Sequence, residues 1–266
     1  MSKLKGYNVG GVIHFIINNG PYSAKYSKDF IHNKWDQTNG NNVVLAFLSR
    51  SYHESVKNKN AYFLTQIGGE DSGKKDLSKI TQKTAAVILE TIQGGAGFIQ
   101  PINGYLTKVQ KKCNEVGALL ILDEIQPGIG RTGKLFGFEN YNCIPDVVVT
   151  GKGLGGGMPI GAFTASKEMM NSLSVNPKLG HITTFGGHPV IAAAALATLK
   201  EITCSTLMKD ALFKENLIRK ELQHPIIKEI RGKGLMLALI VESAEIANKI
   251  VLQSKENGLI LFWLLF

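Results

Sequence analysis

The sequence contains few cysteines, and their spacing excludes the classes of protein that depend on them. Three occur among 266 residues: Cys113, Cys143 and Cys204. Three widely spaced thiols without a C-x-x-C pair fit neither a disulfide framework nor a zinc site. We therefore expect free thiols, a reducing, cytoplasmic compartment, and no metal site.

Long apolar runs are also missing. No stretch approaches the ~20 apolar residues that a membrane-spanning helix requires. The start of the chain lacks the charged region and apolar core of a signal peptide, so we expect no membrane partner. The most apolar segment, Gly258–Phe266, has the length of a strand, and we predict that it forms the last strand.

A single basic surface is missing as well, although the net charge is +9. The lysines are scattered and are not interleaved with aromatic residues, so we expect no nucleic-acid partner. A solvated basic surface is the simpler interpretation, and it is compatible with a modest attraction for an anionic substrate or a phosphate cofactor. With 44% hydrophobic residues, the chain can bury a sizeable core.

What the sequence does contain is an alternation of apolar strands and helices. Tyr105–Val116 predicts a helix that Gly117 ends. Such an alternation predicts an α/β fold with a mostly parallel sheet covered by helices on both faces. The continuous apolar runs of strand length are Val43–Phe47, Ala85–Leu89, Ala118–Leu122 and Val147–Thr150.

The C-terminal third continues the alternation. Val190–Ile202 and residues 207–222 predict helices, Arg231–Val241 a glycine-led strand, and residues 242–256 a further helix. We place a large domain at residues 1–205 and part of a smaller α/β domain at residues 206–266.

Three polar residues stand at the ends of predicted strands: Glu90, Asp123 and Lys152. Ligands of such sheets bind at the carboxyl ends of the strands. A lysine at the end of a buried strand suits a nucleophilic amine whose pKa falls readily, and a surface lysine in a loop is the alternative. A carboxylate such as Asp123 can keep a ring nitrogen of a cofactor protonated, or it can serve a turn or a helix cap.

Two nucleotide-binding motifs are possible interpretations of the glycine-rich segments. A P-loop fails because Gly153 stands where Ser or Thr is needed and Asp146 where the first glycine is needed. Gly128–Gly133 matches the dinucleotide fingerprint, but the residues Asp123–Pro127 separate it from the strand, and no helical pattern follows. A dinucleotide-dependent oxidoreductase is therefore a distant alternative.

Six segments together carry a family resemblance, and this resemblance runs from about residue 84 to residue 266. They are Leu89–Gly94, Leu122–Gly133, Pro145–Val148, Gly151–Gly161, Thr183–Gly187 and Arg231–Met236. In this order they resemble the class-III aminotransferases of pyridoxal 5'-phosphate (PLP) fold type I. The family includes acetylornithine, ornithine, lysine and 4-aminobutyrate aminotransferases. The resemblance implies a seven-stranded-type sheet and the transfer of an amino group from an amino acid to a 2-oxo acid.

The resemblance also implies roles for residues around the cofactor. Lys152 would form the internal aldimine and move the proton between substrate and cofactor. Asp123 would pair with the pyridine nitrogen, and Gln126 would bond the phenolic oxygen of the ring. Glu90 would lie near the ring and help to position Asp123 and the substrate.

Further implied contacts lie at the edges of the cofactor. Thr184 precedes a predicted helix, where hydroxyls and amides favour an anion or simply cap the helix. By resemblance it would reach the phosphate of the neighbouring subunit's cofactor, which implies a homodimer. Tyr52 would stack on the ring, and Asn19 and Gly20 belong to the segment where the family has its phosphate-binding turn.

Some positions depart from the family pattern. Pro21 has no N–H for a phosphate oxygen, Glu54 replaces a glycine, and Gly95 stands where many members have a glutamate. We also expect the chain to lack the family's first segment and its carboxylate-binding arginine. A truncated or degenerate relative that binds PLP or is inactive is therefore the alternative to a working aminotransferase.

Overall fold

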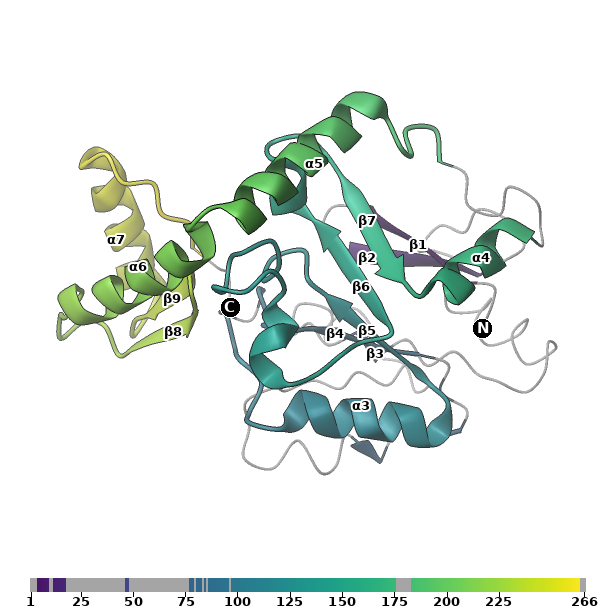
Figure 1. The fold of residues 1–266 in the computed structure, drawn as a ribbon. Helices are drawn as coiled ribbons and strands as arrows, with labels where there is room; N and C mark the ends of the chain where they lie inside the picture. The colour runs from purple at the N-terminus through teal and green to yellow at the C-terminus, as the bar shows by residue number, and fades with distance from the viewer. Residues whose placement is uncertain are drawn as a thin grey trace.

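A five-stranded sheet forms the centre of the fold (Figure 1). The computed structural model describes residues 4–9, 12–17, 46–47, 77–78, 80–82, 84, 86–95, 97–175 and 183–263. Within these residues the strands of the sheet, in spatial order, are β3 (Ala46–Phe47), β4 (Ala86–Glu90), β5 (Leu119–Asp123), β6 (Val147–Gly151) and β7 (Gly161–Ala165). A separate antiparallel hairpin joins β1 (Leu4–Val9) and β2 (Val12–Ile17).

The sheet is mostly parallel, which confirms the predicted fold class. Strands β3 to β6 run parallel to one another, and β7 pairs antiparallel with β6. In the register of β4 and β5, Glu90 lies beside Asp123, and in that of β5 and β6, Asp123 lies beside Val149. Strand β7 escapes sequence prediction because Gly161–Ala165 is a short segment without a continuous apolar run.

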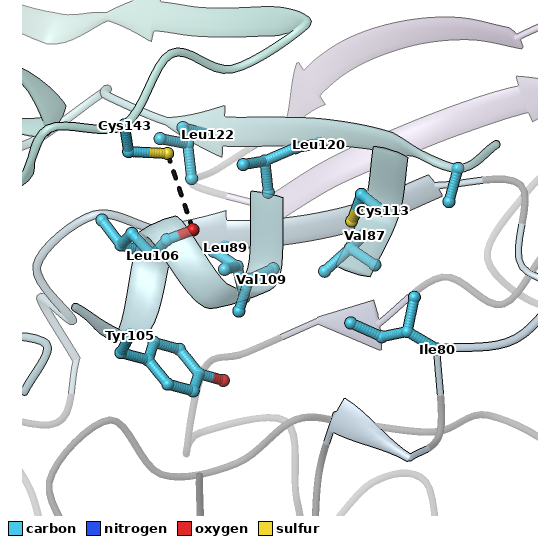
Figure 2. Packing of buried hydrophobic residues seen from close by; sticks show 11 residues of the cluster. Ile80, Val87, Leu89, Tyr105, Leu106, Val109, Cys113, Leu120, Leu122 and Cys143 are labelled. Carbon is cyan, nitrogen blue, oxygen red and sulfur yellow. Dashed lines mark hydrogen bonds between the residues drawn. The ribbon is translucent and has the colours of Figure 1, made fainter. Parts of the chain in front are cut away.

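One face of the sheet packs against helix α3 (Tyr105–Val116) (Figure 2). Alternate residues of β4 and β5 point to this face because successive side chains of a strand point to opposite sides. Burying each such side chain stabilises the fold by roughly 1.5–3 kcal/mol. Gly117 ends α3 with φ of 75°, as predicted. The facing residues are Val87, Leu89, Leu120 and Leu122 of the sheet and Leu106, Val109 and Cys113 of α3.

The other residues of the same strands fill a second cluster on the opposite face. Its members from the sheet are Ala86, Ile88, Ile121 and Val149, with Phe163 of β7 packed against them. The central strands are therefore buried on both faces, as their continuous apolar sequence predicts.

The remaining elements follow β7 in the chain. They are α4 (Lys167–Val175), α5 (Pro189–Cys204), α6 (Leu207–Glu221), β8 (Glu229–Lys233), β9 (Met236–Ile240) and α7 (Ala244–Glu256). In Figure 1, α6, α7 and the hairpin of β8 and β9 gather beside the sheet, at one end of α5. The boundary at residue 205 stays a prediction.

Two C-terminal predictions are wrong. Arg231–Val241 is a hairpin and not one strand, because Gly234 adopts φ of 61° and turns the chain between β8 and β9. Residues 259–263 form no strand within the described chain, where Ile260 and Phe262 are exposed.

No single described helix has the length and apolar character of a membrane span. Only α5 and α6 taken together meet both criteria, and the chain bends by 66° between them.

Candidate active site

Glu90, Asp123 and Lys152 meet at one edge of the sheet. Glu90 is the last residue of β4, Asp123 is the last residue of β5, and Lys152 directly follows β6. Because these three strands are adjacent and parallel, their carboxyl ends lie side by side. The structure thus confirms that the three polar residues share the edge where such sheets bind ligands.

Asp123 has one carboxylate oxygen committed to its own turn and one available. Its Oδ1 accepts a hydrogen bond from the Ile125 amide at 2.9 Å. Within the described chain its second oxygen accepts no hydrogen bond. Burial raises the pKa of Asp123 to about 6, while the Ile125 amide and the charge of Lys152 act in the opposite direction. The residue therefore serves a turn, as one interpretation predicts, through its Oδ1 alone within the described chain.

Lys152 begins the short 3-10 helix η5 (Lys152–Gly155) in an unusual backbone conformation. Its φ is 42°, in the left-handed region that residues with a Cβ rarely adopt. The side chain is exposed, as in the alternative interpretation of a surface lysine. The cause is the glycine-rich turn that follows, which carries Lys152 to the surface at the end of β6.

Helix α5 fixes this turn by close packing. A Cβ at Gly156 would lie 2.3 Å from Oγ1 of Thr198 in α5, and φ of Gly156 is 57°. Leu154 is buried against Ala195 of the same helix. The Lys152 turn therefore rests on α5, and the absence of a side chain at Gly156 permits that contact.

The side chains of Gln126 and Glu90 both lie next to Gly94. The Gly94 amide donates to Oε2 of Glu90 at 2.8 Å. A Cβ at Gly94 would lie 2.4 Å from Oε1 of Gln126, so that only glycine leaves room for the amide side chain. The structure thus brings Gln126 to the same edge as Glu90 and Asp123.

The threonine segment before α5 does not cap the helix. The N-cap residue is His188, which makes no side-chain hydrogen bond to the helix, and Pro189 occupies the first turn. Thr184 is exposed in the preceding turn. Capping therefore does not account for Thr184, and its predicted phosphate contact stays a prediction. Tyr52, Asn19 and Gly20 lie outside the described residues.

Sequence analysis missed one acid at this edge, Glu124. Its side chain is fully buried and accepts hydrogen bonds from the Thr91 hydroxyl and from two amides of the 3-10 helix η4 (Gly137–Tyr141). Burial raises its pKa to about 7. The available signal was the alternation of β5, which places Glu124 in step with Leu120 and Leu122, the buried residues facing α3.

The structure contradicts the interpretation of Gly128–Gly133 as a dinucleotide-binding motif. Residues 125–132 form consecutive turns, and no α-helix begins within or directly after them. Gly128 instead lies against its own turn, where a Cβ would meet the backbone oxygen of Glu124 at 2.5 Å. The fingerprint requires a helix whose N-terminus faces the pyrophosphate, and that element is absent here.

Comparison with known proteins identifies the family of the chain. The family model "Aminotransferase class-III" matches residues 24–263. The chain is 42% identical, over 187 residues, to an acetylornithine aminotransferase of Caldanaerobacter subterraneus subsp. tengcongensis, a match that covers 68% of this chain and 46% of that protein. The chain thus spans about half the length of that relative.

Solved structures show the same fold. The Plasmodium falciparum ornithine delta-aminotransferase superposes with a TM-score of 0.72 at 30% identity, covering 91% of this chain and 63% of that one. A Toxoplasma gondii ornithine aminotransferase, described with partial occupancy of PLP at its active site, gives 0.72 at 27% identity, over 91% and 62% of the two chains. On these matches, the chain belongs to the class-III aminotransferases, which are PLP-dependent enzymes of fold type I.

Proposed function

We propose that this chain binds PLP and moves an amino group from an amino acid to a 2-oxo acid, with Lys152 as the residue that reacts with the cofactor. The observation that carries the proposal is the meeting of Glu90, Asp123 and Lys152 at one sheet edge, with the charge of Lys152 acting on Asp123. The expected amino donor is of the acetylornithine, ornithine, lysine or 4-aminobutyrate type. The acetylornithine and ornithine aminotransferases among its relatives support the first two.

The residues at the edge fit a planar pyridine ring that carries an oxygen substituent. The second oxygen of Asp123 is available to a ring N–H, and burial of the carboxyl makes that acceptor sensitive to a cationic partner. The primary amine of Lys152 is exposed at the same edge. Gln126 offers an amide to a ring oxygen from beside Gly94. The donor set therefore matches what the ring of PLP presents.

Each residue then has a distinct task. Bound PLP supplies an electron sink that stabilises negative charge at the substrate carbon. The amine of Lys152 acts as the nucleophile that holds the cofactor and as the base that carries a proton at the substrate carbon. Asp123 keeps the ring nitrogen protonated by accepting a hydrogen bond from the ring N–H at its available oxygen. Glu90 and Gln126 orient the ring.

The assembly and the compartment belong to the same proposal. Thr184 is exposed ahead of α5, where it can contact a phosphate bound to a second copy of the chain, so we expect a homodimer. The described thiols are unpaired, with Cys113 and Cys143 buried. Free thiols fit a reducing, cytoplasmic compartment.

An absorbance spectrum with added PLP tests the proposal. The wild-type chain should develop a cofactor band that Lys152→Ala lacks, and glutamate should shift that band. The control is Lys167→Ala, an exposed lysine at the start of α4, which should behave as wild type. A Lys152-dependent band that no amino acid shifts would indicate a cofactor binder without a substrate site. No band at all would contradict the proposal and leave an inactive relative.

A further inference from the structure

Glu124 is a buried carboxylate to which the proposed chemistry gives no task. Its side chain has an exposed fraction of 0%. Oε1 accepts hydrogen bonds from the Thr91 hydroxyl at 2.5 Å and from the Phe138 amide at 2.9 Å, and Oε2 accepts one from the Gly137 amide at 2.6 Å. Three donors directed at one carboxylate favour its ionised form against the cost of burial.

These bonds tie together the segments that carry the site. Thr91 directly follows Glu90 at the end of β4, and Glu124 directly follows Asp123 at the end of β5. The Glu124 amide donates to the Val149 oxygen of β6 at 2.8 Å, three residues before Lys152. A single side chain thus links the ends of β4 and β5 with η4, while its backbone links them to β6.

The packing around Glu124 leaves it little freedom. A Cβ at Gly137 would lie 3.1 Å from Oε2 of Glu124, and one at Gly128 would lie 2.5 Å from its backbone oxygen. Thr91 is itself fully buried. Because Glu124 and Thr91 are both fully buried, losing one of these bonds leaves a buried polar group unpaired.

We propose that Glu124 is a positioning residue, which holds the carboxylates of Glu90 and Asp123 in one fixed arrangement through its bonds to Thr91 and to the amides of η4. The inference rests on the proposed function and deepens it, since it names the residue that sets the geometry of the cofactor edge. A displacement of about 1 Å at such an edge can cost about 100-fold in rate.

Two backbone amides report the position of these carboxylates directly. The Gly94 amide is bonded to Glu90 and the Ile125 amide to Asp123, and neither is bonded to Glu124. The Leu120 amide, bonded to Asp146 at the other end of β5, reports opening of the whole sheet. Hydrogen exchange at these sites can be followed in the chain without cofactor.

The variant is Glu124→Gln, whose NH2 group must face at least one of the two η4 amides, that of Gly137 or that of Phe138. We expect exchange at Gly94 and Ile125 to be at least 10-fold faster than in wild type, with Leu120 unchanged. Glu139→Gln is the matched control, because Glu139 belongs to the same η4 but is exposed; it should leave both amides at the wild-type rate. Faster exchange confined to Gly137 and Phe138, or equal acceleration at all sites, would overturn the proposal.

A milder variant covers the case in which Glu124→Gln does not fold. Thr91→Val removes one hydrogen bond and keeps the shape of the side chain, and it should accelerate Gly94 and Ile125 in the same sense. Wild-type exchange at both amides in this variant would overturn the proposal.

The cofactor band separates this inference from the proposed function. With PLP, a folded Glu124→Gln should show a Kd about 10-fold higher than wild type, and an unchanged Kd would count against positioning. If the wild-type chain itself shows no Lys152-dependent band, the proposed function fails, and the exchange at Gly94 and Ile125 still decides whether Glu124 positions the two carboxylates.

Discussion

The sheet and the C-terminal elements of this chain are held together by different means. Strands β4 and β5 are buried along almost their whole length between two apolar clusters. Helix α7, by contrast, has no buried residue, and α6 has one, Ala211. The candidate site lies at the edge of the well-buried part, where packing fixes the ends of three strands.

Polar and backbone contacts are among those that attach the C-terminal elements to the segments beside the sheet. The Leu235 amide donates to the Arg131 oxygen at 2.9 Å, and Gln100 donates to the Gly232 oxygen at 2.9 Å. Both contacts reach the β8–β9 hairpin. Changes at the sheet edge should therefore affect chemistry, whereas changes at the hairpin should affect the attachment of the C-terminal elements and hence stability.

The largest expected effect comes from Asp123→Asn. A neutral amide cannot hold a proton on the ring nitrogen, so the rate of the half-reaction with an amino acid should fall by about 100-fold or more. Single-turnover absorbance measures it.

Asp146→Asn is the control for this variant, because Asp146 accepts from the Leu120 amide at 2.8 Å at the opposite ends of the same strands. It should lower stability by about 1 kcal/mol and leave the rate near wild type. Equal loss of rate in both variants would remove the distinction between the two edges.

The next effect concerns stability against pH and the buried Glu124. Its pKa is raised from 4.5 in the unfolded chain to about 7 in the folded protein, so the native state binds this proton more tightly. The free energy of unfolding should therefore fall by about 3 kcal/mol as pH rises from about 4.5 to about 7. Urea unfolding at several pH values across this range measures the free energy of unfolding of wild type and of Glu124→Gln. The fall with pH should be present in wild type and absent from Glu124→Gln. If the free energy of unfolding changed with pH equally in both proteins, the pKa of Glu124 would not be raised in the folded protein.

A smaller effect tests the attachment of the hairpin. Gly234 has φ of 61°, and its Cβ would lie 2.4 Å from the Arg131 oxygen. Gly234→Ala should therefore lower stability by at least about 2 kcal/mol, through strain and contact together. Gly258→Ala, with φ of 82° and nothing within 4 Å, should cost about 1 kcal/mol from strain alone. Denaturant unfolding compares them, and equal losses would mean that the Arg131 contact does not matter.

The smallest effect is expected at Arg219. Its guanidinium donates to the backbone oxygens of Ile230 and Gly232 at 2.5 and 2.7 Å, a fork that lysine cannot reproduce. Arg219→Lys should lose about 1 kcal/mol. Arg231→Lys, which alters a pair with the exposed Glu229, should lose less than about 0.5 kcal/mol. Thermal unfolding of the two variants provides the measurement, and the reverse order would contradict this view of the hairpin.

The central elements could be predicted because their buried residues produce a regular spacing of apolar residues in the sequence. Leu106, Val109 and Cys113 recur on one face of α3, and Gly117 ends the helix where its left-handed conformation is needed. The strand-end positions of Glu90 and Asp123 follow from the same periodicity, together with the rule that parallel strands end at one edge.

The missed features depend on contacts that no local pattern encodes. The β8–β9 hairpin resembles one strand in the sequence because its turn depends on Gly234, and glycine also occurs in strands that approach another backbone. Glu124 could not be predicted from the sequence because its hydrogen-bond partners, Thr91 and the amides of η4, come together only in the folded chain. The exposure of Lys152 likewise depends on how the following turn rests on α5.

Chemical trapping of the cofactor tests the central claim most directly. The full chain is incubated with PLP, reduced with borohydride, digested, and mapped by mass spectrometry. The account predicts that a phosphopyridoxyl group is attached to Lys152 in preference to the other lysines, and that Asp123→Asn weakens this preference. Modification spread evenly over the exposed lysines, with none favoured at Lys152, would contradict the claim that the ends of β4, β5 and β6 form one cofactor site.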